Sequence, residues 1–341
     1  MKKKVLVVLL AVFMVAVLFA GCAPKQKPAE NNNQEQPQEK VLKVAAVYAT
    51  PIEEPWDGCI HKALLKAKDE YGIKYVWSEN VGYSDFEKVL RQYAGQGYDI
   101  IFGDAFGSED AVRRVAKDFP KIAFVFGSGE GPAAPNLSVF DDWIQEPAYL
   151  CGLIAGKITK TNIVGVVGGV PVPEVNRIIN AFIYGAKEAN PKTKVKVSFI
   201  GSWFDPQKAK EMALSEIQQG ADVLFAERYG VIDACKEKHV YAFGNLQDQH
   251  SLAPDIVITS PVWDMWPTVS YVIQSVKNGT YQAQDLREWS MMAKGGAKLA
   301  PFYEFKDKLP KDVLDLVSKR EQEIKTGKFR VPINEGPPKG D

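Results

Sequence analysis

The sequence predicts an α/β protein made of two doubly wound, parallel-sheet lobes, and three observations lead to that prediction. Strand-like and helix-like segments alternate from about Val41 onward, an order typical of parallel sheets with helices on both faces. The alternation comes in two blocks of similar length, which meet near Ile158. The chain has 341 residues, 46% of them hydrophobic, which is enough to bury two separate cores.

The first block begins with an apolar segment that predicts a strand. The next segment has apolar residues at helical spacing, which predicts a helix. Ser84 and the nearby Glu87 indicate the start of a second helix, because such pairs cap helix N-termini. In chain order, we expect strands at 42–48, 74–78, 99–102, 122–126 and 137–140, and helices at 56–71, 84–96 and 108–119.

The second block repeats this order, and its first strand ends in Gly168-Gly169. We expect helices at 147–158, 175–189 and 207–219, and strands at 162–167, 195–200, 223–226, 241–244 and 256–259. We therefore assign residues 41–158 with about 262–283 to the N-terminal lobe, residues 159–261 with about 284–325 to the C-terminal lobe, and residues 326–341 to a Pro- and Gly-rich surface tail. A hinge would join the lobes, and a ligand would lie in the cleft between them.

The first 22 residues have the pattern of an export signal: basic residues, an apolar run and a small residue before Cys22. L-F-A-G-C resembles a bacterial lipobox, although Phe19 stands where Leu is usual, so Cys22 is the expected lipidation site. The alternative is an uncleaved anchor, but the run is shorter than the ~20 residues that a membrane span needs. Residues 23–40 are polar and indicate a flexible tether. Both alternatives place the folded part on the extracytoplasmic face of the cell membrane.

Composition argues against several classes of partner and chemistry. The 42 basic and 42 acidic residues balance, so no bulk charge favours nucleic acid. The four cysteines and three histidines have no metal-site spacing, and no motif indicates a cofactor. Cys151 lies in an apolar helix, so we expect a buried free thiol. No nucleophile and base pair is evident, so we do not expect an enzyme; the alternative is a purine-acting enzyme with Asp104 or Glu227 as the general acid or base.

The stretch G-S-W-F-D-P at 201–206 follows a predicted strand and precedes a predicted helix. Asp205 is placed to cap that helix, and Pro206 suits its first turn. Trp203 and Phe204 then lie at the carboxyl end of a strand, where open α/β sheets bind ligands. They could stack on a flat ligand, or they could simply pack within the domain.

Several motifs together resemble one family. They are V-P-V-P-E-V at 170–175, G-A-K at 185–187, G-S-W-F-D-P at 201–206, D-Q at 248–249 and K-L-A-P-F at 298–302. With the export signal they resemble the basic membrane protein (BMP) family of substrate-binding lipoproteins, over roughly residues 41–325. The resemblance implies the type I periplasmic-binding fold, a purine base or nucleoside as ligand, and the permease and ATPase of an ABC importer as partners. We expect a monomer.

The resemblance also implies site residues. Trp56 and Trp203, on different lobes, would sandwich a purine when the lobes close. Asp141, or failing that Asp142, would contact the base edge, although a helix cap before Trp143 is the alternative for this pair. Further candidates follow predicted strands or begin a helix; they are Phe106, Asp104, Asn176, Glu227, Arg228 and Trp263. For Glu227 and Arg228 an inter-lobe salt bridge is an equal alternative, for Asn176 a helix cap, and Trp263 is expected at the hinge or cleft wall.

Two departures from the family pattern bear on the ligand. Where nucleoside-binding relatives have a ribose-binding aspartate this chain has Leu246, and where they have a lysine it has Trp263. Ribose hydroxyls left unpaired in a closed cleft would cost roughly 1–3 kcal/mol each. We therefore expect a free purine base, adenine-like, rather than a nucleoside such as adenosine or guanosine. A nucleoside is the next alternative, followed by another flat heterocycle such as a thiamine precursor or a flavin fragment; a surface receptor that senses its ligand without transport is also open.

Overall fold

The computed structural model describes residues 40–341, of which Val41–Asp341 form one compact unit. The predicted signal peptide, the lipidation of Cys22 and nearly all of the predicted tether lie outside the described residues. Within residues 40–341, no helix is long and apolar enough to cross a membrane.

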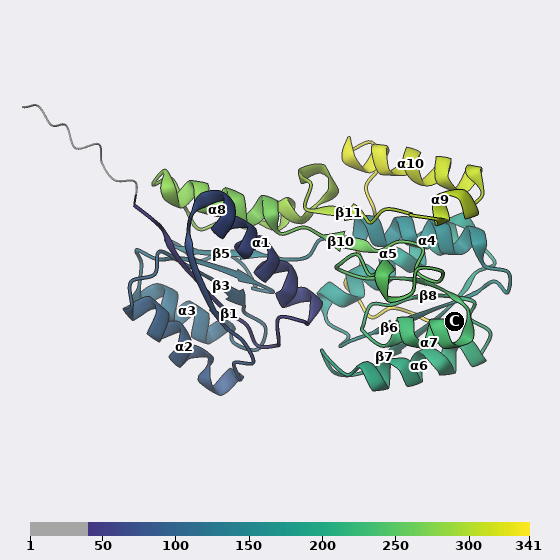
Figure 1. Ribbon diagram of the computed structural model, residues 1–341, viewed down its shortest axis with the longest axis horizontal. Helices are drawn as coiled ribbons and strands as arrows, with labels where there is room; N and C mark the ends of the chain where they lie inside the picture. The colour runs from purple at the N-terminus through teal and green to yellow at the C-terminus, as the bar shows by residue number, and fades with distance from the viewer. Residues whose placement is uncertain (1–39) are drawn as a thin grey trace, which may run out of the picture. The chain divides into compact units, whose positions relative to one another are not determined.

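The first sheet has five parallel strands in the order β2-β1-β3-β4-β5. The strands are β1 (Lys43–Val47), β2 (Lys74–Ser78), β3 (Ile100–Asp104), β4 (Ala123–Gly127) and β5 (Leu137–Phe140), and the connecting helices are α1 (Pro55–Tyr71), α2 (Tyr83–Gly95) and α3 (Glu109–Asp118). Along β1, Val44 and Ala46 pack in the core under α1, whereas Ala45 and Val47 pack in the core under α2 and α3. This alternation, which follows from the strand period of two, gives a sheet covered on both faces (Figure 1).

The second sheet repeats this topology with four parallel strands in the order β7-β6-β8-β9. Its strands are β6 (Ile163–Gly168), β7 (Lys194–Phe199), β8 (Val223–Phe225) and β9 (Tyr241–Phe243), and its helices are α4 (Gln145–Ile158), α5 (Pro173–Ala189), α6 (Pro206–Gln218) and α7 (Val231–Lys238). The predicted α/β class with two parallel sheets is thereby confirmed. Helix α4, which was predicted to end the first lobe, packs most extensively against α5.

One predicted strand is wrong. Residues 256–259 form no strand, because within the described chain Val257 makes only an isolated parallel bridge to Ala242. The Ile256 and Val257 N–H groups bond to the Ala253 carbonyl in a turn, and the segment after the turn lies along β9, where the Ile258 N–H donates to the Ala242 carbonyl at 2.9 Å. This pairing is a single bridge long, so it does not continue the sheet as a strand.

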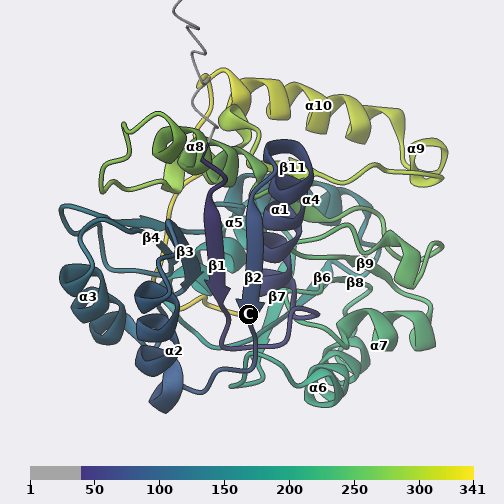
Figure 2. The ribbon, with the colours of Figure 1, turned by 60° about the vertical axis from the view of Figure 1, so that its left-hand side comes forward.

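We call the first sheet with its helices the first half of the molecule, and the second sheet with its helices the second half. The last third of the described chain contributes elements to both halves. Strands β10 (Pro261–Trp263) and β11 (Ala297–Leu299) pair antiparallel, and the helices here are α8 (Trp266–Lys277), α9 (Phe305–Lys308) and α10 (Lys311–Lys325), with 3₁₀ turns at His250–Leu252, Arg287–Ser290 and Met292–Lys294. Helix α8 packs against α1, as Figures 1 and 2 both show, whereas α10 packs against α4. These segments and α7 were not predicted. The chain therefore crosses between the halves at β10 and again at β11.

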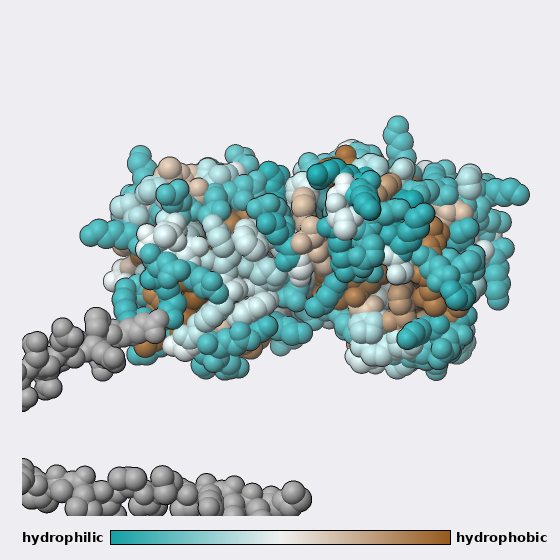
Figure 3. Space-filling model, turned by 90° about the horizontal axis from the view of Figure 1, so that it is seen from above, coloured by the Kyte–Doolittle hydropathy of each residue, from teal (hydrophilic) through white to brown (hydrophobic). Residues whose placement is uncertain are grey.

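In the described chain, a further site could lie on a hydrophobic part of the surface, at the cysteines or at a cluster of metal ligands. The face in Figure 3 is mostly hydrophilic, with hydrophobic residues in small areas. Cys59, Cys151 and Cys235 are buried free thiols, as predicted for Cys151. In the part of the chain that the structure describes, no cluster of His, Cys, Asp and Glu could hold a metal ion.

Candidate ligand-binding cavity

A cavity of about 630 Å³ opens where the carboxyl ends of strands from both sheets face each other. Its walls include Asp104 at the end of β3, Trp56 after β1, and Arg228 after β8. In both sheets the strand order reverses here, between β1 and β3 and between β6 and β8, and ligands of open α/β sheets bind at such switch points. The volume is typical of small-molecule sites, which measure roughly 300–1,000 Å³.

The structure brings most of the predicted site residues to this cavity. Those that line it are Trp56, Asp104, Phe106, Asp141, Trp203 and Arg228. Glu227 lines a small adjoining crevice together with Trp203 and Arg228. The other three are buried close by but are not among the lining residues: Asp142, Asn176 and Trp263.

Trp56 is held rigidly by aromatic packing. Its ring stacks on Phe140, with centroids 5.7 Å apart and an interplanar angle of 18°, and lies 5.1 Å from the ring of Trp263. A Cβ at Gly127 would come within 1.9 Å of the Trp56 ring, so only glycine leaves room for this orientation. Trp263 therefore supports Trp56 from behind, and its indole N–H donates to the Ser290 hydroxyl at 3.0 Å.

Trp203 lies on the loop between β7 and α6, where the helix begins as predicted: Asp205 accepts a hydrogen bond from the Lys208 N–H at 3.0 Å. The Trp203 ring packs edge-on against the Phe106 ring, with centroids 5.0 Å apart and an interplanar angle of 84°. The Arg228 guanidinium lies 5.1 Å from the same ring, within cation–π range. Aromatic side chains from both halves therefore line one cavity.

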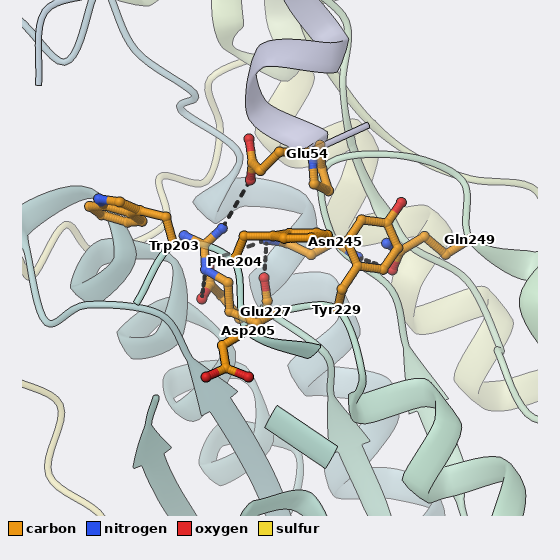
Figure 4. Close-up of a pocket in the computed structure, with 10 residues that line it drawn as sticks. Glu54, Trp203, Phe204, Asp205, Glu227, Tyr229, Asn245 and Gln249 are labelled. Atoms are coloured by element: carbon orange, nitrogen blue, oxygen red, sulfur yellow. Dashed lines mark hydrogen bonds and ion pairs between the residues drawn. The ribbon is translucent and has the colours of Figure 1, made fainter. Parts of the chain in front are cut away.

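Arg228 links the two halves through charge. Its Nη1 lies 3.4 Å from the Glu54 carboxylate, and its Nε lies 3.1 Å from Glu227. Glu54 also caps α1 by accepting from the Trp56 and Asp57 N–H groups at 2.8 and 3.2 Å. In Figure 4 the dashed lines join Glu54 and Glu227 to the guanidinium between them. The sequence left open whether Arg228 forms an ion pair between the lobes. The structure contains such a pair, between Arg228 and Glu54.

A second buried arginine organises the other side of the cavity. Arg177 of α5 is only 2% exposed; its Nη2 donates to Asp141 at 2.6 Å and its Nη1 to Glu335 at 2.7 Å. Asp142 lies 3.7 Å from the same guanidinium and is fully buried. Asp141 therefore joins the two halves while still lining the cavity.

Carboxyl groups outnumber guanidinium groups in the lining. The acidic residues are Glu54, Asp57, Asp104, Glu130, Asp141, Glu174 and Glu335, against Arg177, Arg228 and Arg287. Burial raises the pKa of Asp104 to about 7, and it also raises the pKa of Asp57 and of Glu174. Such groups are strong acceptors for ligand N–H groups when ionised.

Residues 41–332 match the model of the Bmp family, described as PnrA-like ABC transporter substrate-binding proteins. The chain belongs to this family. A purine-binding protein of Brucella abortus is 33% identical over 304 residues, covering 86% of this chain and 85% of that protein. A putative ABC transporter glucose-binding protein of Haloferax volcanii, TsgA13, is 31% identical over 292 residues, covering 84% and 72%.

Solved structures agree with the fold of this Bmp-family protein. An ABC transporter solute-binding protein of Aeropyrum pernix K1 superposes with a TM-score of 0.75 at 19% identity, covering 86% of this chain and 94% of that one. The expected family and its periplasmic-binding architecture are thereby confirmed.

Several residues that line the cavity of this family member are not marked by any motif in its sequence. Glu54 stands directly before Pro55, the first residue of α1. Pro at this position marks a helix start, but Glu is not among the usual cap residues, so only the helix start was evident from the sequence. Arg177 lies within an ordinary helical pattern, and Glu335 is separated from it by 158 positions, so no local signal marks either one.

Leu246 and Trp263 lie in the core behind the cavity. Leu246 is 2% exposed with a positive φ of 61°, and its carbonyl accepts from the Trp263 N–H at 2.8 Å. Neither is among the residues that line the cavity. The preference for a base over a nucleoside stays a prediction, because it depended on these two positions.

Proposed function

We propose that this Bmp-family protein binds a purine base, adenine-like, between Trp56 and Trp203 and delivers it to the permease and ATPase of an ABC importer. The protein would act on the extracytoplasmic side of the cell membrane, held there by lipid on Cys22. One observation carries the proposal: indoles from both halves line a single cavity whose polar wall consists largely of carboxyl groups.

The chemistry of a purine suits this lining. Its two faces are flat and aromatic, so stacking on each indole would contribute roughly 0.5–1.5 kcal/mol beyond area burial. Its ring N–H and exocyclic amino groups are donors, and Asp104 and Asp141 offer acceptors at the carboxyl ends of two strands of the first sheet. The similarity to a protein named for purine binding supports this ligand class.

A nucleoside is the alternative ligand. The cavity volume of about 630 Å³ favours a nucleoside, because a base alone would leave part of the cavity empty. A second alternative is a receptor that senses its ligand without transport. Measuring purine uptake by cells distinguishes the two roles: deletion of the protein should abolish uptake if the protein serves an importer, and should leave uptake unchanged if it only senses the ligand.

The first experiment identifies what the purified protein carries, by mass spectrometry of an extract. The stripped protein is then titrated calorimetrically with adenine, guanine, hypoxanthine, their nucleosides and glucose. We expect stoichiometric binding of bases, with adenine the tightest. Equal or tighter binding of nucleosides would make the base preference wrong, and no heat with any purine or nucleoside would refute the proposed ligand class.

Trp203→Ala should weaken adenine binding by roughly 10–100-fold, because the variant loses both the stacking and the apolar area that this indole contributes. Trp77→Ala is the matched control, since Trp77 is a 39% exposed indole on β2 and is not among the residues that line the cavity. An adenine affinity equal in the two variants would contradict a stacking role for Trp203.

A further inference from the structure

The C-terminal segment 329–341, here called the strap, is tied down at both ends. Phe329 stacks on Tyr149 of α4, with centroids 5.4 Å apart, and Val331 is buried. At the far end, Asp341 pairs with the backbone of edge strand β7. Its N–H donates to the Val195 carbonyl at 2.8 Å, and its carboxylate accepts from the Val195 N–H at 3.0 Å. Figure 1 marks this end of the chain over the second half of the molecule.

The middle of the strap is held against helix α5. The Asn180 side chain donates to the carbonyls of Asn334 and Gly336, both at 2.8 Å, and the Asn176 side chain donates to the Glu335 carbonyl at 3.1 Å. These bonds fix the backbone on either side of Glu335. The sequence predicts a tail that lies over the surface, whereas Glu335 belongs to the wall of the ligand cavity.

Glu335 changes what Arg177 can offer to a ligand. The two carboxylates of Asp141 and Glu335 occupy separate nitrogens of the guanidinium, Nη2 and Nη1. Arg177 is 2% exposed and cannot turn to solvent for other partners, whereas the Glu335 side chain is 43% exposed. Without Glu335, the Nη1 donors would be available to a carbonyl or another acceptor of a ligand in the cavity.

We propose that the strap is part of the ligand site and that Glu335 is a specificity residue: by occupying Nη1 of Arg177 it disfavours ligands that present a carbonyl there and favours ligands that present an amino group. This inference rests on the proposed function and deepens it. The strap thus explains chemically why an amino-purine would be preferred to an oxo-purine.

The test compares adenine with hypoxanthine, in which a carbonyl replaces the amino group. Calorimetry on the full protein measures the ratio of the two affinities for wild type, Glu335→Ala, Glu335→Gln and a deletion of residues 333–341. We expect the adenine preference to fall roughly tenfold in Glu335→Ala and in the deletion, since each frees a charged donor. Glu335→Gln should fall between wild type and Ala, because its amide oxygen still accepts from Nη1.

Glu211→Ala is the control, because it removes one carboxylate from an exposed position on α6 of the same half. A ratio that stays within about twofold of wild type in Glu335→Ala and in the deletion would overturn the inference while leaving purine binding intact. A change in the deletion without one in Glu335→Ala would overturn the role of the carboxylate. If wild type binds neither purine, the proposed function fails first and the inference fails with it.

Discussion

At the scale of single residues, the cavity is distinguished by carboxyl groups held away from water. Asp104 ends β3, accepts a hydrogen bond from the Phe106 N–H at 2.9 Å, and has its pKa raised to about 7 chiefly by burial. A carboxyl with such a pKa changes protonation near neutrality, and only its ionised form accepts hydrogen bonds with both oxygens. Ligand binding at this residue should therefore depend on pH.

We predict that adenine binds about tenfold more tightly near pH 8 than near pH 6, because the Phe106 N–H occupies one Asp104 oxygen and only the ionised carboxylate keeps the other as a strong acceptor for a ligand N–H. Lowering the pH through about 7 protonates Asp104 and weakens binding. The opposite sign applies to stability: a raised pKa favours the folded ligand-free protein at low pH, and this contribution is lost as the pH rises through about 7.

The measurement is calorimetric titration across this pH range with Asp104→Asn as the comparison. The variant should bind adenine more weakly and with a much smaller pH dependence. If Asp104→Asn keeps the full pH slope of wild type, another lining carboxyl is responsible and the assignment to Asp104 is wrong.

At the scale of elements, close packing of α4 on α5 depends on glycines. A Cβ at Gly185 would lie 2.2 Å from the Tyr149 carbonyl oxygen, and one at Gly152 would lie 2.2 Å from the Phe182 carbonyl oxygen. Backbone atoms cannot move aside as a flexible side chain can, so the two helices touch only because both positions lack side chains. This contact also positions α5, which carries Arg177 to the cavity.

We predict that Gly185→Ala lowers the free energy of unfolding by roughly 1–3 kcal/mol, because the added methyl group forces the helices apart. Gly95→Ala in α2 is the control. A Cβ there meets nothing within 4 Å, and Ala in a helix is favoured over Gly by roughly 0.5–1 kcal/mol. Urea denaturation of both variants checks this, and a Gly185→Ala protein as stable as wild type would show that α4 and α5 can separate at little cost.

At the scale of the whole molecule, the halves are joined by the chain between β5 and α4, at β10 and at β11, and by ion pairs in the wall of the cavity. Arg228 pairs with Glu54 at the start of α1, and Arg177 pairs with Asp141 after β5. The side chains of both arginines are nearly buried, at 6% and 2% exposed. The lobe boundaries and the hinge stay predictions, but these pairs set the charge that a ligand meets.

Arg228→Met should lower the free energy of unfolding by roughly 3–5 kcal/mol near pH 8, because it leaves the carboxyl groups of Glu54 and Glu227 buried without a cation. Burial already raises the pKa of Glu227 to about 8. The cost should therefore shrink as the pH is lowered and these groups take up protons.

Chemical denaturation at two pH values measures this effect. Arg91→Met is the control, since Arg91 pairs with Glu87 and Asp118 on the surface and such pairs contribute ~0–1 kcal/mol. An equally small loss in both variants would show that Arg228 does not compensate buried charge.

The sequence by itself determined the α/β class, most helix and strand positions and the family, and it indicated Trp56 and Trp203, both of which line the cavity. These depend on local patterns: periodicity marks a helix or strand wherever it lies. Trp56 and Asp104 follow strands of the first sheet and Trp203 follows a strand of the second, and the carboxyl ends of such strands are where open α/β sheets bind ligands. Its predictions for residues 1–22 and for most of the tether lie outside the described residues.

Only the tertiary structure decided which side chains share the cavity. Strand 256–259 was wrong because a turn at Ala253 limits the pairing of this segment with β9 to a single bridge at Val257, and the residue pattern does not show that turn. Trp263 was predicted to lie at the hinge or in the cleft wall, but in the structure it packs against Trp56 and does not line the cavity. Glu335 reaches Arg177 across 158 positions. Contacts at such separation arise from the folded path of the whole chain, so no local pattern of residues encodes them.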